Sequence, residues 1–371
     1  MATSKALDHD LVIVGAGLTG LSLACWLVEL SARYGQATPD VRLLEPRTAY
    51  SNDRTWCFWD RMDHPFRGHI THRWGHWQVS SGDRCAMQSD PERPYALLPA
   101  DRLYDHAREC IEACPEMSLE QGVRVSSVRE RDGEVRVVTD AGELSTQAVV
   151  DTRLPEGLPE TSTNGFWQVF TGFELECRDH GYDVTTARLM DFVPCESHPC
   201  FVYLLPTDKH HLLVEWTAFR DRRDNQDSWA QLEQWLAQAG ISEYGLLRSE
   251  SATLPMIPMR GEHRAGRVIR AGVGAGWMRA ATGYHFASCQ RGTRMLAEQI
   301  LAARGSGRWR LRPPVVRPPW LDWMDRVFLR ALRTNPGRAP DWFLALFAHT
   351  TAAQMSRFMN DEPTPGDALS V

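Results

Sequence analysis

The stretch Asp10-Leu-Val-Ile-Val-Gly15-Ala-Gly17-Leu-Thr-Gly20 decides the fold of this chain. Its short β-branched run leads straight into glycines, which predicts a buried parallel strand, and residues 18–30 predict the helix that follows. Gly15 permits a tight turn, Gly17 lets a pyrophosphate approach the backbone, and Gly20 lets helix and strand pack closely. The positive end of the helix dipole faces the phosphates. The stretch therefore predicts a dinucleotide site.

A second strand and its terminal acid extend this pattern. Residues 41–45 read VRLLE, and an acid such as Glu45 at the end of the second strand binds ribose hydroxyls, which favours FAD or NAD over NADP. A late glycine-rich run, residues 270–276, offers further backbone N–H groups at a helix start. It lacks the Gly-Asp ending of many FAD enzymes, which counts mildly against oxygen chemistry. The candidate cofactor contacts in these segments are Gly15, Gly17, Leu18, Thr19, Gly20, Glu45, Gly272 and Gly276.

Composition excludes several classes of protein. The 371 residues are 43% hydrophobic and 24% charged, which suits a globular protein of two domains, and the net charge of −6 gives no basis for binding nucleic acid. The nine cysteines form no Cys-x-x-Cys pair and no zinc spacing with histidine, so we expect reduced cytosolic thiols and no metal. No apolar leader precedes the first strand, and the longest apolar run, residues 21–30, is too short to span a membrane. We expect a soluble or peripheral protein.

Strand after strand is predicted between residues 165 and 219, which indicates an antiparallel sheet inserted into the α/β frame. Asp132-Gly133 predicts the turn of an earlier hairpin. We expect an α/β fold, with a Rossmann-type FAD-binding domain, an inserted antiparallel β-sheet substrate domain and C-terminal helices. The predicted divisions are a discontinuous FAD-binding domain at 8–55, 96–158 and 263–305, a substrate-binding domain at 56–95 and 159–262, and a helical region at 306–371.

Residues 211–219, HLLVEWTAF, place a lone carboxylate inside an apolar strand. Burial raises the pKa of a carboxyl group and keeps it protonated near neutral pH, as the protonation of a carbon–carbon double bond would require. Alternation puts Glu215 on one face with Leu213, Thr217 and Phe219, and Trp216 on the other face. The pattern alone leaves open whether the Glu215 face meets solvent.

Seven ordered segments resemble the bacterial lycopene β-cyclase family, and together they span nearly the whole chain. Because the matches keep their order, no single short motif has to carry the resemblance. The segments are DLVIVGAGLTGLSLA with VRLLEP, Asp53-Arg-Thr-Trp-Cys-Phe-Trp, Gly165-Phe-Trp-Gln-Val-Phe-Thr-Gly, the group Leu189-Met-Asp, Phe201-Val-Tyr-Leu-Leu-Pro and Leu212-Leu-Val-Glu, Ala280-Ala-Thr-Gly-Tyr, Met324-Asp-Arg-Val-Phe-Leu-Arg-Ala-Leu, and Arg357-Phe-Met-Asn-Asp-Glu-Pro.

The resemblance implies a non-covalent FAD that must be reduced, with NAD(P)H as electron source and no net redox change. It implies a linear carotenoid substrate, lycopene or γ-carotene, whose ψ end group is protonated, closed to a six-membered ring and deprotonated to a β-ionone ring. Glu215 takes the position of the acid. Asp191 is expected to orient the acid or the flavin, or else to be a strand-end hydrogen-bond acceptor. Arg54 and Arg102 are candidates for flavin contacts, with a surface ion pair as the alternative.

One departure from the family concerns the residue after Glu215. The family usually has a second acid there, and this chain has Trp216, which puts catalysis by a carboxylate pair in doubt. Trp216 either stabilises a cation through its ring face or belongs to the core. Tyr203 and Tyr284 are either cavity walls or core, and Thr282 shares the motif of Tyr284 as a further candidate substrate contact.

Two helices are expected after a proline-rich linker at residues 312–319. Their aromatic residues and arginines either pack inside the molecule or dock it on a membrane, from which a long polyene must be extracted. We expect a cytoplasmic protein associated peripherally with the inner face of the cell membrane. A flavin-dependent monooxygenase of an apolar polyene or terpenoid and a non-catalytic carotenoid or lipid binder are the alternatives to a cyclase. The residues expected to line one face of the first helix are Trp320, Leu321, Met324, Val327, Phe328 and Ala331.

Overall fold

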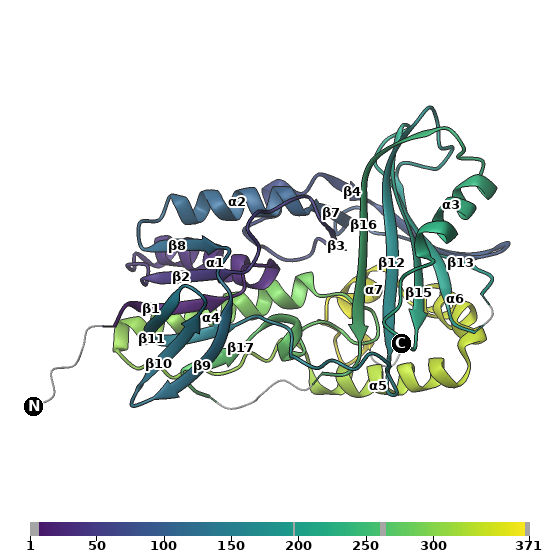
Figure 1. Cartoon of the computed structure of the whole chain (residues 1–371). Coiled ribbons are helices and arrows are strands. Elements are labelled where there is room, and N and C mark those ends of the chain that lie inside the picture. The colour runs from purple at the N-terminus through teal and green to yellow at the C-terminus, as the bar shows by residue number, and fades with distance from the viewer. Residues whose placement is uncertain (1–6, 196, 260–264, 368–371) are drawn as a thin grey trace, which may run out of the picture.

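The computed structural model describes residues 7–195, 197–259 and 265–367, and two large sheets dominate it (Figure 1). The first sheet has the strand order β8-β2-β1-β11-β10-β9, and the end of β11 also pairs with β17. Strand β1 pairs in parallel with β2 and β11, whereas β9 and β10 form the predicted hairpin. The strands are β1 (His9–Val14), β2 (Val41–Glu45), β8 (Met117–Gln121), β9 (Val125–Arg131), β10 (Glu134–Thr139), β11 (Gly142–Asp151) and β17 (Val268–Arg270).

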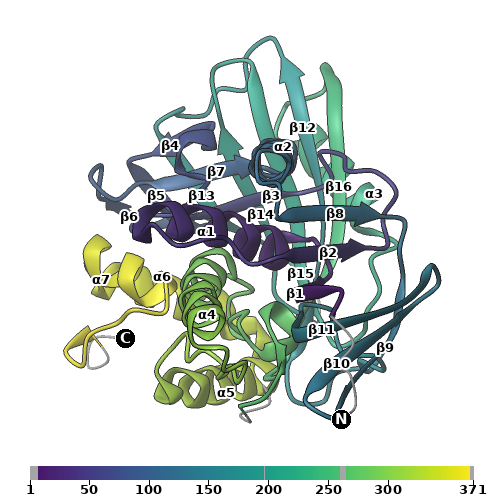
Figure 2. The same ribbon diagram turned by 90° about the vertical axis from the view of Figure 1, so that its left-hand side faces the viewer.

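Three helices cover one face of this sheet: α1 (Leu18–Tyr34), α2 (Ala100–Glu112) and α4 (Phe286–Ser306). Helices α1 and α4 pack side by side (Figure 2). In β1, Leu11 and Ile13 face the helices, whereas Val12 and Val14 join the valines of the hairpin on the other face. Because both faces are covered, residues 11–14 of the strand are all apolar, as a buried parallel strand requires.

The second sheet has the order β16-β12-β15-β14-β13-β5-β6, and its pairs are antiparallel except β13 with β5. It contains the predicted inserted strands. Helix α3 (Ser228–Gln238) covers one face, where Leu232 and Leu236 pack with Val214 and Trp216. The strands are β5 (His76–Ser81), β6 (Arg84–Ser89), β12 (Phe166–Cys177), β13 (Thr186–Val193), β14 (Cys200–Pro206), β15 (His211–Arg220) and β16 (Tyr244–Met256).

A small sheet, ordered β3-β7-β4, lies against the other face of the second sheet. It comprises β3 (Thr55–Trp59), β4 (His72–Trp74) and β7 (Tyr95–Pro99). These strands are too short to show a clear alternation of apolar and polar residues. For that reason the sequence of residues 50–95 does not predict them. Trp59, Trp74 and Trp77 are buried at this junction, so they serve as core.

Three helices, not the two expected, follow the linker: α5 (Pro319–Thr334), α6 (Ala339–His349) and α7 (Ala352–Met359). The predicted face of α5 is wrong at Val327, which is 49% exposed, while Asp325 is buried. The helix is turned because Asp325 has an arginine partner in the interior. Among the described residues, no helix has the length and apolar content needed to cross a bilayer.

The predicted domain divisions stay a prediction, and the two sheets draw on the following parts of the chain. Residues 8–55, 96–158 and 263–305 supply the first sheet and its three helices, whereas 56–95 and 159–262 supply the second sheet and much of the small one. Positions 260–264, which include the predicted boundary, lie outside the described residues, as do position 196 and positions 368–371.

The prediction of reduced thiols throughout is wrong at one place, because a disulfide joins Cys195 and Cys200. These residues flank the turn between β13 and β14, and the antiparallel pairing of the two strands brings them together. The spacing of these two cysteines matches no common disulfide motif, so the bond could not be predicted from it. The other seven cysteines are free.

Candidate functional site

The lone carboxylate of β15 lies inside the molecule, on the face of the second sheet that meets the small sheet. Glu215 pairs directly with Gly172 of β12 on one side and with Tyr203 of β14 on the other, and residues paired in this way share a face. The predicted companions Leu213 and Phe219 are buried there, at 4% and 1% exposure, and Glu215 is half-buried. This face is therefore an interior one, which resolves the alternative that the sequence left open.

A second acid that sequence reasoning missed joins Glu215 on this face. Glu250 of β16 pairs with the same residue of β12, Gly172, from the opposite side. The side chains of Glu215 and Glu250 share a hydrogen bond. Glu250 also accepts hydrogen bonds from Thr55 (Oγ1 to Oε2 3.1 Å) and from Arg248, with which it forms an ion pair. The available signal was the alternation of Arg248 and Glu250 along β16, which fits a solvated face equally well.

The surroundings of Glu215 raise its pKa well above the ordinary value of a glutamate. Burial is the largest cause because it penalises the charged form, and the negative charge of Glu250 and the hydrogen bond with it act in the same direction. The Arg248 guanidinium opposes them, but it is paired with Glu250 and with Glu174 (Nε to Oε2 3.0 Å). These surroundings favour the protonated form of Glu215.

Three tyrosines and a thiol surround this carboxyl group. Tyr95 Oη lies 2.9 Å from the hydroxyl oxygen of Tyr203 and 2.9 Å from that of Tyr284. Burial raises the pKa of each tyrosine and of the Cys57 thiol. The structure thus brings the predicted Tyr203 and Tyr284 to Glu215. It adds Tyr95 and Cys57, which stand in the segment of weak periodicity.

The structure does not bring Asp191 or Trp216 to Glu215. Trp216 pairs with Val202, and Val202 pairs with Asp191, so all three lie on the opposite face of the sheet. Trp216 is 3% exposed in the core beneath α3. Asp191 accepts a hydrogen bond from Ser80 (2.8 Å), as the strand-acceptor alternative describes.

The glycines before and within α1 form the tight turn expected of a dinucleotide site. Gly15 has a φ of +90°, and a Cβ at Gly20 would collide with the carbonyl oxygen of Gly15. A Cβ at Gly17 would meet nothing within 4 Å. The turn is therefore closed between Gly15 and Gly20 and open at Gly17, where a pyrophosphate would approach.

Glu45 closes this turn from the end of β2. It accepts hydrogen bonds from the backbone N–H of Ala16 (2.8 Å) and from Arg47 Nε (2.9 Å). Burial opposes ionisation, but these hydrogen bonds outweigh it and lower the pKa of Glu45. Arg47 and Tyr50 also donate to the carbonyl oxygen of Ala16, at 3.1 and 2.8 Å. Arg47 was missed, although it stands two residues after the predicted ribose acid.

The late glycine-rich run closes on the first turn of α1. Gly272 has a φ of +73°, and a Cβ there would lie 2.5 Å from Thr19 Oγ1. Gly276, with a φ of +76°, ends the short 3-10 helix Gly272–Ala275. Leu18 and Thr19 are both buried beneath this loop region. The two glycine-rich segments therefore meet at one place, although the late run forms a 3-10 turn rather than the predicted helix start, because α4 begins only at Phe286.

The two predicted arginine contacts have ordinary surroundings. Arg54 pairs with Asp53 (Nη2 to Oδ2 2.6 Å) and its side chain is 55% exposed. Arg102 is exposed on α2. The alternative of a surface ion pair fits Arg54, whereas Arg102 is exposed and forms no ion pair within the described residues.

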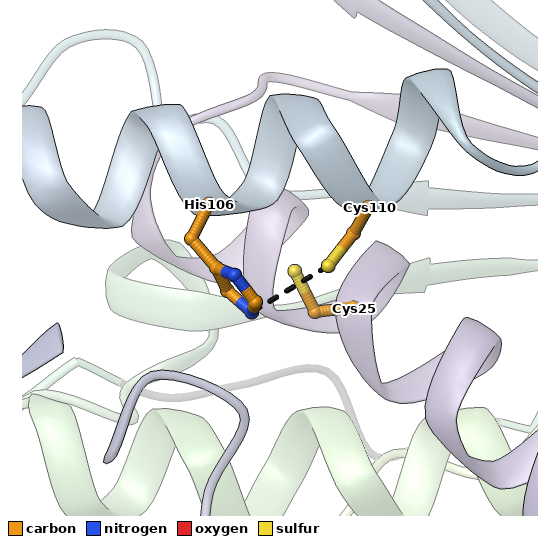
Figure 3. Close-up of side chains that lie close together, drawn as sticks. All are labelled: Cys25, His106 and Cys110. Carbon is orange, nitrogen blue, oxygen red and sulfur yellow. Dashed lines mark hydrogen bonds between the residues drawn. The ribbon is translucent and has the colours of Figure 1, made fainter. Parts of the chain in front are cut away.

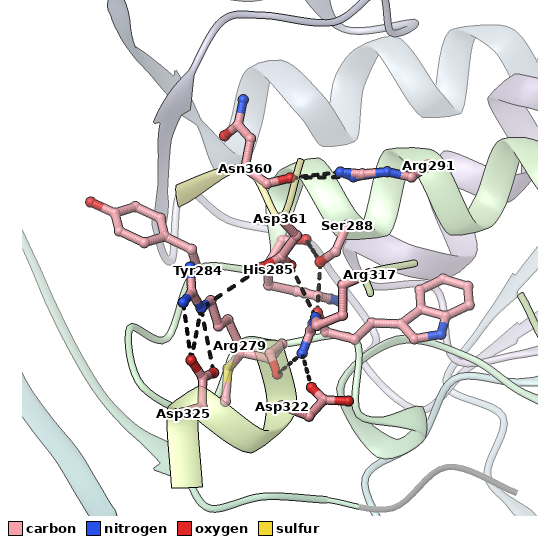
Figure 4. Close-up of polar contacts among 12 residues, drawn as sticks. Arg279, Tyr284, His285, Ser288, Arg291, Arg317, Asp322, Asp325, Asn360 and Asp361 are labelled. Carbon is pink, nitrogen blue, oxygen red and sulfur yellow. Dashed lines mark hydrogen bonds and ion pairs between the residues drawn. The ribbon is translucent and has the colours of Figure 1, made fainter. Parts of the chain in front are cut away.

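A buried ion pair holds the loop that carries Thr282 and Tyr284 (Figure 4). Arg279 is 1% exposed, lies 3.0 Å from Asp325 of α5 and donates to the carbonyl oxygen of Phe358 (2.6 Å). Asp325 also accepts a hydrogen bond from the backbone N–H of Ala281 (3.2 Å). The C-terminal helices therefore fix the loop in position, with Tyr284 directed to the tyrosine group.

A second ion pair continues this network. Arg317 Nε lies 3.1 Å from Asp361, which is also 3.8 Å from Arg279. Burial and the charge of Arg317 lower the pKa of His285 to about 3, so this histidine is neutral at physiological pH. Each of these buried acids thus faces arginine, and the network is a structural one.

The fold of this chain is shared with solved structures of a reductase-like protein, a monooxygenase and a halogenase. The chain is similar to a geranylgeranyl bacteriochlorophyll reductase-like protein from Thermoplasma acidophilum (TM-score 0.63, 11% identity, covering 97% of this chain and 94% of that one). It is similar to p-nitrophenol 4-monooxygenase from Pseudomonas putida (TM-score 0.60, 16% identity, 97% and 95%) and to a halogenase solved in complex with FAD (TM-score 0.58, 10% identity, 94% and 78%). These likenesses show the fold.

Sequence then sets the family. The lycopene cyclase protein family matches residues 10–371, and the chain belongs to it. The chain is 23% identical over 329 residues to the chloroplastic lycopene beta cyclase of Solanum lycopersicum and 24% identical over 332 residues to that of Arabidopsis thaliana. Each match covers 82% of this chain but 63% and 62% of the respective relatives, so the chain spans less than two thirds of their length.

Proposed function

We propose that this protein is a lycopene β-cyclase, a redox-neutral enzyme that depends on reduced FAD and closes the ψ end groups of linear carotenes to β-ionone rings. The observation that carries the proposal is the protonated Glu215 on an interior face lined by apolar residues and tyrosines. A neutral carboxylic acid sheltered from water is the group that can protonate an alkene. Membership of the lycopene cyclase family supports the same reaction.

Glu215 holds the proton that starts the reaction. Its O–H bond breaks as a C–H bond forms at the terminal double bond of the substrate, which leaves a tertiary cation. The neighbouring double bond attacks the cation and closes the six-membered ring, and loss of one proton from the adjacent ring carbon restores a double bond. The rings of Tyr95, Tyr203 and Tyr284 provide electron-rich faces for the cation in a region away from water.

FAD is the cofactor that the glycine turn fits. The open side of Gly17 admits a pyrophosphate, the N-terminus of α1 faces it, and Glu45 stands where a ribose would bind. The loop from Gly272 to Gly276 borders the same place. Reduced flavin, with NAD(P)H as electron source, supplies negative charge that favours a nearby cation. We expect protein stripped of FAD to lose cyclisation and to regain it with reduced FAD.

The proposed substrate is lycopene or γ-carotene, taken from the inner face of the cell membrane by a cytoplasmic, peripherally bound enzyme. Trp323 is 64% exposed and Val327 49% exposed on α5, where they offer apolar contacts to a bilayer. We expect Trp323→Asp to weaken flotation with phospholipid vesicles, whereas unchanged flotation would contradict docking through this helix.

One assay tests the proposed function: anaerobic incubation of the protein with lycopene and reduced FAD. We expect cyclised product without oxygen. Product only in air would indicate the monooxygenase alternative, whose fold this chain shares. Pigment binding without any product would indicate a non-catalytic binder.

A further inference from the structure

The register of three strands brings two acids together over one glycine. Strand β12 lies between β15 and β16, and Gly172 pairs with Glu215 on one side and with Glu250 on the other. Strands flanking a common neighbour lie about 9–10 Å apart, so the two side chains must lean across β12 to meet. A Cβ at Gly172 would lie 2.6 Å from Glu215 Cγ and 3.3 Å from Glu250 Cγ. Any side chain at Gly172 would therefore occupy the space in which the acids meet.

The two acids have different partners. Glu250 is 7% exposed, forms an ion pair with Arg248 and accepts a hydrogen bond from Thr55. Within the described residues, Arg248 is paired with Glu250 and Glu174 rather than with Glu215. Glu250 thus has an arginine partner that Glu215 lacks, and the negative charge of Glu250 opposes ionisation of Glu215. Environments that separate two carboxyl groups in this way assign one as proton donor and the other as its charged partner.

We propose that Glu250 is the second carboxylate of this enzyme, delivered by β16 instead of by the residue after Glu215, and that Gly172 is the positioning residue that lets the pair form. This inference rests on the proposed cyclase function. Glu215 gives its proton to the substrate double bond and becomes a carboxylate. The proton that leaves the ring carbon after closure returns to the pair, so each turnover consumes and releases one proton. Glu250 acts through Glu215 by keeping the proton on it between turnovers.

The pH profile of cyclisation distinguishes this role from a structural one. Glu250→Gln removes the negative charge that opposes ionisation of Glu215. Arg248 then keeps only Glu174 as a charged partner. We therefore expect Glu215 to ionise more easily. The alkaline limb of kcat/KM should move to lower pH by about one unit or more. A profile that superimposes on that of the wild type would overturn the proposal. Absence of product from the wild type would instead remove the proposed function itself.

A glycine pair gives a second test with a matched control. Gly172→Ala should lower kcat at least about tenfold, because the new methyl group displaces the acid. Gly245 lies in β16 of the same sheet, where a Cβ would meet nothing closer than 3.8 Å, and Gly245→Ala should keep activity within about twofold. Equal activity of the two variants would overturn the role of Gly172. If Gly172→Ala does not fold, the pH profile of Glu250→Gln decides.

An independent observation concerns two cysteines and a histidine between α1 and α2. Figure 3 shows His106 and Cys110, one turn apart on α2, pointing toward Cys25 of α1. The ligand atoms of the three residues lie within 4.8 Å of one another, and the His106 ring nitrogen Nε2 is 3.5 Å from Cys110 Sγ. The ring of His69 lies 4.2 Å from that of His106, measured between centroids. Two sulfurs and an imidazole nitrogen form a donor set typical of zinc.

We infer that Cys25, His106 and Cys110 bind a divalent zinc-class cation that links α1 to α2, with His69 as the adjacent source of a fourth ligand. The spacing of residues along the chain did not indicate this metal site, because Cys25 is far in sequence from His106 and Cys110. This site would not take part in cyclisation.

Cobalt titration of the reduced full-length protein tests this inference. We expect about one Co²⁺ per chain, with a thiolate-to-metal absorption band, and displacement by Zn²⁺. Cys110→Ser should lose the band, and Cys25→Ser should do the same, whereas Cys85→Ser, at an exposed cysteine outside the cluster, should keep it. No band in the wild type, or equal loss in Cys85→Ser, would overturn the site. A Cys25–Cys110 disulfide found by mass spectrometry in protein purified without reductant would also overturn it.

Discussion

Two groups of buried acids differ in how their charges are balanced. Beneath the C-terminal helices, Asp325 and Asp361 face Arg279 and Arg317. On the second sheet, Glu215 and Glu250 lie near a single arginine, Arg248, which pairs with Glu250 and with the half-exposed Glu174 but not with Glu215. The balanced group holds the ion pairs in place and fixes a loop. The unbalanced group favours the protonated form of one acid, as the proposed protonation of an alkene requires.

The largest effect expected on this contrast is in catalysis. Glu215→Gln removes the proton but keeps the shape, so cyclisation should fall by about 10²–10⁴-fold, the usual contribution of a general acid. The exposed Glu176→Gln on β12 is the matched control and should retain activity. Steady-state product formation from lycopene in detergent micelles is the measurement. Near-normal turnover by Glu215→Gln would exclude this residue as the acid.

For the balanced group, Asp325 and Asp361 with their arginines, we expect a substitution to change the stability of the fold rather than catalysis. Asp325→Ala leaves Arg279 buried without its closest partner, which should lower the free energy of unfolding by about 3–5 kcal/mol. Asp341→Ala breaks exposed ion pairs of α6 with Arg84 and Arg338 and should leave the free energy of unfolding nearly unchanged. Urea unfolding measures both. Similar losses in the two variants would show that burial of the network matters little.

The unbalanced group should make stability depend on pH. Because the pKa of Glu215 is raised in the folded state, the unfolded chain ionises first, from about pH 4.3 upward. The stability that the protonated group contributes is therefore lost as pH rises toward the folded pKa, by up to about 1.4 kcal/mol per pH unit. Relative to the wild type, Glu215→Gln should gain stability by this slope above about pH 5. A difference between the two proteins that stays constant with pH would argue against a raised pKa.

The smallest effect is expected at Asp191, an acid of the same sheet on the opposite face. Asp191→Asn should change turnover by no more than about twofold and stability by about 0.5 kcal/mol. The same lycopene assay checks it. A loss on the scale of Glu215→Gln would mean that the reacting carbons lie on the face covered by α3.

The sequence predicted those features of the structure that depend on residues close together along the chain. The glycines from Gly15 to Gly20, the strands of the inserted sheet and the apolar setting of Glu215 were readable, because each depends on a few neighbouring residues. The position of Glu250 depends on the register of three strands across Gly172, which one sequence does not specify. The burial of Asp325 likewise depends on Arg279, a residue remote from it along the chain.

The difference between local patterns and strand register also explains why Trp216 does not lie with Glu215. Sequence comparison treated the residue after Glu215 as the place of a missing acid, although neighbours on a strand face opposite sides. The sheet places Trp216 in the core beneath α3 and brings Glu250 to the face that carries Glu215. Register over two strand pairs, rather than adjacency along one strand, therefore decides which groups meet.

Infrared difference spectroscopy of the wild type against Glu215→Gln at neutral pH tests the protonated acid without relying on turnover. We expect the wild type to carry a carbonyl stretching band of a protonated carboxylic acid that the variant lacks, with the carboxylate bands unchanged. Loss of a carboxylate band in the variant, with no acid carbonyl band in the wild type, would show that Glu215 is ionised and would contradict its role as proton donor.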